Sequence, residues 1–223
     1  IAKRIFLSKK NLVNYPEKYK SKICSIGDIL NKEIINYLIN KENKSKDKIS
    51  ILVLGGSQGA KVFGEIIPSV INNLKEKGYE VEVNQQCVKE QEKVIKDFYD
   101  KKKIKHNIFT FNKDILKLIL SSDLAITRCG ASTLAELAFT STPFIAVPLS
   151  NSIDNHQHLN AKHYENEYNC WILEQKNFNQ YNLLNLLIEI FNGKKKKKIS
   201  NNIDKSRSKN AYIDIENEIK KFI

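Results

Sequence analysis

From residue 49 onward, the chain alternates short apolar runs with amphipathic segments. The apolar run at residues 49–54 predicts a buried strand, and residues 60–77, which end at Gly78, predict a helix. The alternation continues with predicted strands at residues 79–83, 107–111, 124–127, 143–147 and 169–173, and predicted helices at residues 88–103, 114–121, 131–140, 156–166 and 181–191. Repeated strand–helix units of this length predict an α/β fold, a Rossmann-like parallel sheet with helices on both faces.

Two polar stretches mark the limits of this alternating region. Residues 40–48, NKENKSKDK, break the periodicity and predict a linker or loop, and the lysine run after Gly193 predicts a solvated loop or a helix start. Residues 5–7 and 23–26 are weak strand signals that do not form a domain by themselves. The tail at residues 210–223 has apolar residues at roughly helical spacing, which predicts a helix that needs a partner surface.

The composition, 41% hydrophobic and 28% charged residues, is typical of a soluble globular protein. No apolar run approaches the ~20 residues that span a bilayer, and the N-terminal apolar stretch is too short for a secretory signal. The four cysteines are scattered without a C-x-x-C pair, which favours a reducing cytosol over a zinc site or a disulfide framework. The chain has no methionine, so we expect it to be a fragment or a processed form.

The net charge of +12 raises the question of a nucleic-acid partner. Lysine is spread along the chain and arginine is rare, whereas base readout generally uses clustered arginine and stacking aromatic residues. We therefore expect no nucleic-acid partner. Attraction to an anionic membrane surface is the more plausible use of the excess charge.

A glycine-rich loop, GGSQGA, follows the first predicted strand of the region and precedes a helix. In this position backbone N–H groups can bind an anion at the helix N-terminus. Ser57 and Gln58 are the candidate binding residues of the loop. The sequence matches neither the dinucleotide fingerprint nor the Walker motif, so a tight turn close to a neighbouring helix remains an equal alternative.

The segment ITRCGASTLAEL ends a strand and opens a helix after Gly130. The free N–H groups of Ala131, Ser132 and Thr133 then point toward the strand ends, where a diphosphate fits. Glu136 lies further along the helix, and its carboxylate can accept two hydroxyl donors, which suits a ribose. The alternative is that Ser132 or Thr133 only caps the helix and that Glu136 only favours its dipole.

Two further loops follow predicted strands at the same edge of the sheet. In one, His156 and Gln157 supply hydrogen-bonding groups that suit sugar hydroxyls, and the spacing of the nearby histidines places them on different helix faces, so we expect no metal. In the other, Phe111 could cover a nucleobase while the backbone of Asn112 reads its edge. The alternative for this second pair is a core phenylalanine and a helix cap.

In order and spacing, GGSQGA, F-N-x-D, R-C-G-A-x-T-x-x-E and D-N-H-Q-x-x-N-A resemble the signatures of the MurG family over about residues 22–175. That family transfers N-acetylglucosamine from UDP-N-acetylglucosamine to a lipid-linked muramyl-pentapeptide in peptidoglycan synthesis. The resemblance implies the C-terminal, donor-binding half of a B-type glycosyltransferase that acts peripherally at the cytoplasmic face of the plasma membrane. Residues 1–45 would be a remnant of the N-terminal acceptor domain and linker, residues 46–193 the UDP-sugar domain, and residues 194–223 a basic loop and final helix.

The resemblance also implies a role for each candidate residue. Phe111 and Asn112 would contact the uracil, and Glu136 would bind the ribose hydroxyls. The diphosphate would bind at Ala131, Ser132 and Thr133, with Ser57 and Gln58 in the cleft beside it. His156 and Gln157 would bind the sugar. No cofactor and no metal are implied. Asn31 stands where the family has an arginine near the nucleotide, which puts that contact in doubt.

Nearly the whole acceptor domain of the family is absent from this chain, and the resemblance places the general base there. The catalytic base is therefore unknown. Two other functions remain open from the sequence: a different UDP-sugar-dependent glycolipid transferase, and a non-catalytic basic binding module.

Overall fold

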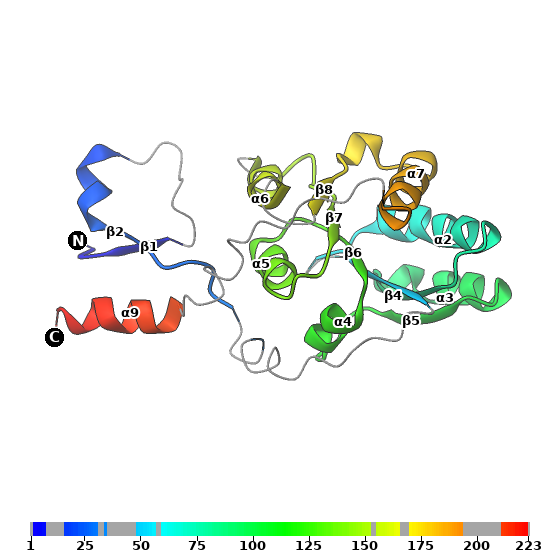
Figure 1. Cartoon of the computed structure of the whole chain (residues 1–223), viewed down its shortest axis with the longest axis horizontal. Helices are drawn as coiled ribbons and strands as arrows, with labels where there is room; N and C mark the ends of the chain where they lie inside the picture. The colour runs from blue at the N-terminus through cyan, green and yellow to red at the C-terminus, as the bar shows by residue number, and fades with distance from the viewer. Residues whose placement is uncertain are drawn as a thin grey trace. The chain divides into compact units, whose positions relative to one another are not determined.

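The structure, a computed structural model, describes residues 2–7, 16–30, 34, 48–56, 59–152, 155–165, 170–193 and 211–222. Contacts divide the chain into two compact units (Figure 1). The larger unit spans Asn40–Ile199, and the smaller unit combines Ile1–Ile39 with Ser200–Ile223. The two ends of the chain therefore belong to one unit, and the long central region forms the other.

The larger unit contains a six-stranded sheet with the spatial order β5-β4-β3-β6-β7-β8. Every neighbouring pair in this sheet is parallel. In chain order the strands are β3 (Ile49–Leu54), β4 (Val81–Gln86), β5 (Lys105–Phe109), β6 (Leu124–Thr127), β7 (Phe144–Ala146) and β8 (Cys170–Ile172). The predicted parallel sheet is confirmed.

Helices cover both faces of this sheet, because alternate residues of each buried strand point to opposite sides. In β3, Ile51 and Val53 belong to one apolar cluster, and Leu52 and Leu54 belong to the other. The first cluster is completed by helices α2 (Lys61–Glu76), α3 (Glu92–Lys101, preceded by the 3₁₀ turn η3, Lys89–Gln91) and α7 (Gln180–Phe191). The second is completed by α4 (Ile115–Ser121), α5 (Ala131–Phe139) and α6 (His156–Glu165).

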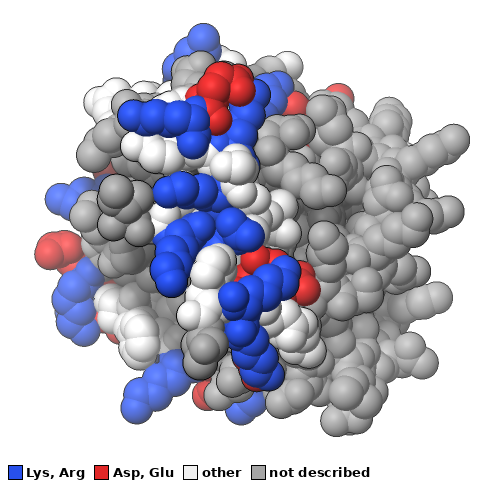
Figure 2. All heavy atoms as spheres, turned by 90° about the vertical axis from the view of Figure 1, so that its left-hand side faces the viewer, with Lys and Arg blue, Asp and Glu red and all other residues white. Residues whose placement is uncertain are grey.

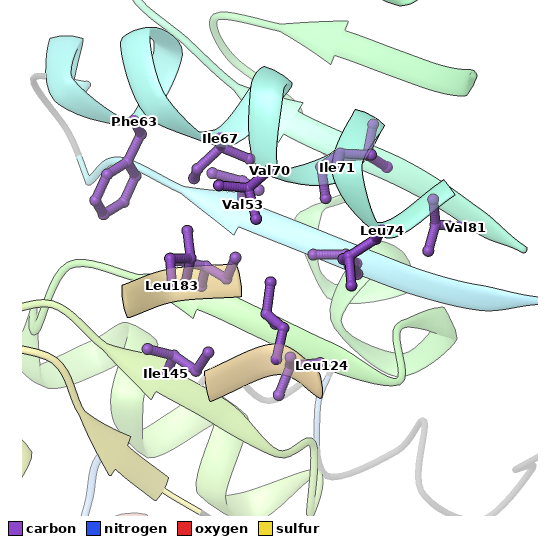
Figure 3. Close-up of a cluster of buried hydrophobic side chains, with 14 of the residues drawn as sticks. Val53, Phe63, Ile67, Val70, Ile71, Leu74, Val81, Leu124, Ile145 and Leu183 are labelled. Atoms are coloured by element: carbon purple, nitrogen blue, oxygen red, sulfur yellow. The ribbon is translucent and has the colours of Figure 1, made fainter. Parts of the chain in front are cut away.

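The first cluster is dominated by one face of α2. Phe63, Ile67, Ile71 and Leu74 recur at helical spacing, and each is fully buried. Figure 3 shows these side chains directed toward the strands and toward Leu183 of α7. The amphipathic pattern that predicts the helix is therefore also the pattern that attaches it to the sheet.

Four strands of this sheet differ from their predicted bounds, and two of them, β4 and β5, differ by more than one residue at each end. The strand expected at residues 79–83 begins at Val81, because Gly78 (φ +90°) and the hydrogen bond from Tyr79 N to Leu74 O close helix α2 first. The strand expected at residues 107–111 is β5, which ends at Phe109 opposite Gln86 of β4. Phe111 therefore lies beyond the end of the sheet.

The strand order reverses between β3 and β6. From β3 the chain moves outward through β4 to β5, then returns to place β6 on the other side of β3 and continues outward to β8. The loops that follow β3 and β6 therefore lead in opposite directions from adjacent strand ends. Ligands of open parallel sheets bind at such a point, outside the carboxyl ends of the strands.

The smaller unit is built around a two-stranded parallel sheet of β1 (Ile5–Leu7) and β2 (Ile23–Ser25), with the 3₁₀ helix η1 (Glu17–Lys22) and the final helix α9 (Ala211–Lys220). The contacts that join helix α9 to the N-terminal segment include an ion pair and a hydrogen bond. Arg4 Nε lies 3.2 Å from Glu218 Oε2, and Tyr212 Oη donates to Leu30 O at 2.9 Å. The predicted partner surface of the final helix is thus the start of the chain.

Figure 2 shows Lys and Arg side chains on one face of the molecule, with Asp and Glu beside several of them. In the smaller unit Lys20 pairs with Glu17, Lys220 with Glu216, and Lys221 with Glu218. Many of the remaining lysines belong to residues 35–47 and 194–210, which are outside the described residues. In the described part of the smaller unit, these three ion pairs add nothing to the net positive charge.

Replacement of Leu74 tests the α2 packing. Leu74 is 0% exposed, so Leu74→Ala should lower the free energy of unfolding by about 2–5 kcal/mol through lost burial and a residual cavity. Leu159→Ala is the control, because Leu159 on α6 is 61% exposed and should change stability by only about 0.5 kcal/mol. Equal effects of the two substitutions in urea denaturation would contradict the described core.

Candidate functional site

The glycine-rich loop begins at the carboxyl end of β3. Gly56 (φ +81°) and Gly59 (φ +70°) adopt left-handed backbone conformations, and Gly59 N donates to Gly56 O at 3.0 Å. A Cβ on Gly55 would lie 2.5 Å from Ala60 N, and one on Gly59 would lie 2.6 Å from Val88 Cγ1. The tight turn therefore accounts for Gly55 and Gly59. The candidates Ser57 and Gln58 lie outside the described residues.

Gln86, the last residue of β4, connects this loop to the next strand end. Its Oε1 accepts from Gly55 N at 3.0 Å, and its Nε2 donates to Thr110 O at 3.2 Å. One side chain thus holds the loop that follows β3 and the loop that follows β5. The sequence analysis missed this residue, because a glutamine at a strand end carries no distinctive pattern.

Helix α5 begins directly after the neighbouring strand β6. Gly130 is its N-cap residue, so neither Ser132 nor Thr133 occupies the capping position, and the capping alternative is wrong. Gly130, Ala131 and Ser132 are exposed. The backbone N–H groups of the first turn have no partner within the helix, and they carry the positive end of its dipole. They are available to an anion at the carboxyl edge of the sheet.

Glu136 lies beyond the first turn of α5, so its position does not suit a purely dipole-stabilising role. The side chain is half-buried, and burial raises the pKa of its carboxyl. Among the described residues its carboxylate has no hydrogen-bond or ion-pair partner. A carboxylate only accepts hydrogen bonds when ionised, so both oxygens are available to hydroxyl donors.

Helix α6 holds the start of α5 through two side chains. Gln157 Oε1 accepts from Cys129 N at 3.2 Å and from Leu149 N at 3.1 Å, and Asn160 Nδ2 donates to Cys129 O at 3.0 Å. Both backbone polar groups of Cys129, the residue before Gly130, are therefore fixed by α6. The side-chain oxygen of Gln157 has a positioning role that the sequence analysis missed, together with Asn160.

The remaining described candidates, Phe111, Asn112 and His156, lie along the same carboxyl edge of the sheet. Phe111 is 76% exposed just beyond β5, so the core alternative for this residue is wrong. Asn112 Oδ1 accepts from Asp114 N at 2.7 Å, which supports the turn that opens α4 and leaves its backbone as the group that could face a ligand. His156 is exposed at the first turn of α6. Asn31, the departure from the family pattern, lies outside the described residues.

The histidines near α6 have local contacts of their own. His158 Nδ1 lies 2.8 Å from Glu174 Oε1, and the ring of His163 packs edge-on against Tyr164 at 4.8 Å between centroids. In the part of the chain that the structure describes, no group of three or more His, Cys, Asp or Glu side chains could hold a metal ion. Within the same residues, no helix combines the length and apolar character needed to cross a bilayer.

A cavity of about 350 Å³ lies at the opposite edge of the sheet. Its lining includes Lys48, Lys75, Tyr79, Lys103 and Lys105, which come from the segments around the amino ends of β3, β4 and β5. Lys75 donates to the carbonyl oxygens of Lys102 and Lys103, and Lys105 pairs with Glu82. This basic cavity is separate from the candidate site at the carboxyl edge.

Comparison with known proteins identifies the family. Residues 50–218 match the Glycosyltransferase family 28 C-terminal domain. The chain belongs to glycosyltransferase family 28. The resemblance to the MurG family that the four motifs indicate is confirmed.

Two curated relatives carry the name UDP-N-acetylglucosamine--N-acetylmuramyl-(pentapeptide) pyrophosphoryl-undecaprenol N-acetylglucosamine transferase. The one from Pelagibacter ubique is 41% identical over 191 residues, which cover 86% of this chain and 53% of the relative. The one from Rickettsia felis is 36% identical over 202 residues, which cover 87% of this chain and 56% of the relative. The chain thus spans about half the length of the curated relatives it matches.

The crystal structure of Acinetobacter baumannii MurG is similar to this chain with a TM-score of 0.76 and 23% identity, over 99% of this chain and 61% of that one. At this level of identity the likeness concerns the fold. The predicted fold, the C-terminal domain of a B-type glycosyltransferase, is confirmed.

The hydrogen bonds that Gln157 accepts from the backbone of Cys129 and Leu149 predict that Gln157 contributes to the stability of the fold. Gln157→Ala leaves the N–H groups of Cys129 and Leu149 without their acceptor, so the free energy of unfolding should fall by about 1–3 kcal/mol. Gln157→Glu keeps an acceptor oxygen at the same distance along the side chain and should lose less. Urea denaturation measures the free energy of unfolding of both variants. An unchanged value for Gln157→Ala would contradict the positioning role of the Gln157 hydrogen bonds.

Proposed function

We propose that this chain is the donor-binding half of a glycosyltransferase that transfers N-acetylglucosamine from UDP-N-acetylglucosamine to a lipid-linked muramyl-pentapeptide in peptidoglycan synthesis. The observation that carries the proposal is the exposed N-terminus of α5 at the point where the strand order reverses, one strand away from the glycine-rich loop. The names of the relatives from Pelagibacter ubique and Rickettsia felis supply the donor and the acceptor.

Each part of the donor has a candidate partner along the carboxyl edge. The diphosphate binds the N–H groups of Ala131, Ser132 and Thr133, because an anion is stabilised at a helix N-terminus. The ribose hydroxyls donate to Glu136, whose carboxylate has no partner among the described residues. The exposed ring of Phe111 covers the uracil, and the backbone of Asn112 reads its edge.

The sugar lies toward α6, where His156 and the amide nitrogen of Gln157 face it as hydrogen-bonding groups. The oxygen of Gln157 is already used by two backbone N–H groups, so only its Nε2 donates to a sugar hydroxyl. Ser57 and Gln58 of the glycine-rich loop lie beside the diphosphate in this proposal. These assignments support a donor that is bound mainly through backbone groups and a few fixed side chains.

The proposed reaction is an inverting displacement at the anomeric carbon. The acceptor hydroxyl oxygen forms a bond to this carbon while the bond to the UDP oxygen breaks, and a general base takes the hydroxyl proton. Charge increases on the leaving diphosphate, so fixed N–H donors at the α5 N-terminus stabilise the transition state more than the ground state. We assign no general base to the residues of this chain.

The acceptor in this proposal is a lipid, so the protein acts at a membrane surface. We propose peripheral association with anionic lipid at the cytoplasmic face of the plasma membrane, to which the net charge of +12 contributes. No nucleic-acid partner is included in the proposal.

Glu136→Ala tests the assignment of the ribose. The variant should lose UDP binding free energy of about 1.5–3 kcal/mol, the usual value for hydrogen bonds to a charged group. The control is Glu65→Ala, an exposed glutamate on α2, which should leave UDP affinity unchanged. Isothermal titration calorimetry measures both variants. If Glu136→Ala leaves binding intact, a non-catalytic basic module becomes the better account.

The isolated 223-residue chain should bind UDP-N-acetylglucosamine weakly and turn over little or nothing, because the base and the acceptor site belong to the other half of the proposed enzyme. A radiolabelled-donor assay with a lipid acceptor measures this directly. Detectable transfer by the isolated chain would refute the assignment of the base. Competition by UDP-glucose and UDP-galactose separates this donor from that of another glycolipid transferase.

A further inference from the structure

Arg128 is the residue that directly follows β6, at the point where the strand order reverses. Its backbone N donates to Leu54 O, the last carbonyl of β3, at 3.0 Å. A Cβ built on Gly56 would lie 3.8 Å from Arg128 Cβ. Arg128 therefore lies directly beside the glycine-rich loop and two residues before the exposed N-terminus of α5.

The guanidinium of Arg128 is directed into the protein, and its contacts among the described residues are to neutral groups. Nη1 donates to Val147 O at 3.1 Å and, more weakly, to Pro148 O at 3.5 Å. Cζ lies 4.9 Å from the ring centroid of Phe63, which belongs to the first turn of α2. The carbonyl groups and the aromatic ring stabilise a cation, but they do not neutralise it.

Arg128 is 9% exposed, and it is the one Lys, Arg, Asp or Glu among the buried side chains of the described residues. No carboxylate in those residues is paired with it. Burial lowers the pKa of the guanidinium, which reflects the cost of keeping this charge away from water. A buried charge without an opposite charge destabilises a protein, so its presence beside a ligand site requires an explanation.

We propose that Arg128 is a binding residue that acts through its charge on the diphosphate of a nucleotide ligand at the glycine-rich loop and the α5 N-terminus. The inference rests on the proposed function, since that function places a diphosphate there. The bound anion supplies the opposite charge that the described protein lacks. Because the guanidinium is buried, water and salt screen it less than they screen an exposed lysine.

Two variants separate the charge of Arg128 from its packing. Arg128→Met keeps a long, unbranched side chain and removes the charge, whereas Arg128→Lys keeps the charge and removes the planar fork. Lys96→Met is the matched control, because it removes an exposed positive charge from α3. Each protein is titrated with UDP and with uridine, which has the same base and ribose and no phosphate, and binding is followed by NMR.

Arg128→Met should weaken UDP binding by roughly ten- to thirtyfold, the effect of removing one charge near the diphosphate at an effective dielectric constant of about 20. Uridine binding should not change, Arg128→Lys should keep most of the UDP affinity, and Lys96→Met should behave as the parent chain. The melting temperature of Arg128→Met should change little, because the removal of an unpaired buried charge offsets the loss of the hydrogen bond to Val147 O.

The inference is overturned if Arg128→Met weakens UDP and uridine by the same factor, or if Arg128→Lys is as damaging as Arg128→Met. Either result would give Arg128 a structural role only. If the parent chain binds no UDP at all, the proposed function fails together with the inference. If the parent chain binds UDP and Arg128→Met binds it equally well, only the inference fails.

Discussion

The parallel pairing of β3 with β6 is the constraint on which the candidate site depends. The register aligns Leu54 with Thr127, and the hydrogen bond from Arg128 N to Leu54 O extends the pairing one residue beyond the strand. Because both strands end at the same level, the glycine-rich loop and the start of α5 lie side by side and then lead in opposite directions. A slip of this register would separate the two backbone anion-binding elements and would invert which residues of β3 face each helical layer.

Most polar side chains at this edge bond to the backbone of the protein. Gln86 holds the loops that follow β3 and β5, and Gln157 and Asn160 hold the residue before the α5 N-terminus. Among the described residues, the groups left for a ligand include the α5 backbone N–H groups, the carboxylate of Glu136 and the exposed ring of Phe111. Fixed backbone donors lose little entropy when a ligand binds, which favours a preorganised site.

The sequence predicts the elements of the larger unit well, because buried parallel strands are short apolar runs and their helices are amphipathic. The bounds of β6 are predicted correctly, since LAIT is apolar between two polar residues. The end of β4 is not predicted correctly, because Asn84, Gln85 and Gln86 are polar. These residues belong to the strand through their pairing with β3 and β5. Gln86, Gln157 and Arg128 were not assigned their structural roles, because their partners are distant in the sequence and become neighbours only after folding.

The central claim is that a diphosphate binds the open N-terminus of α5. A crystal structure of this chain with UDP tests it most directly. We expect phosphate oxygens within hydrogen-bond distance of the backbone nitrogens of Ala131, Ser132 and Thr133, with the ribose beside Glu136. UDP bound instead in the lysine-lined cavity at the amino edge of the sheet, with the α5 N-terminus left free, would contradict the account.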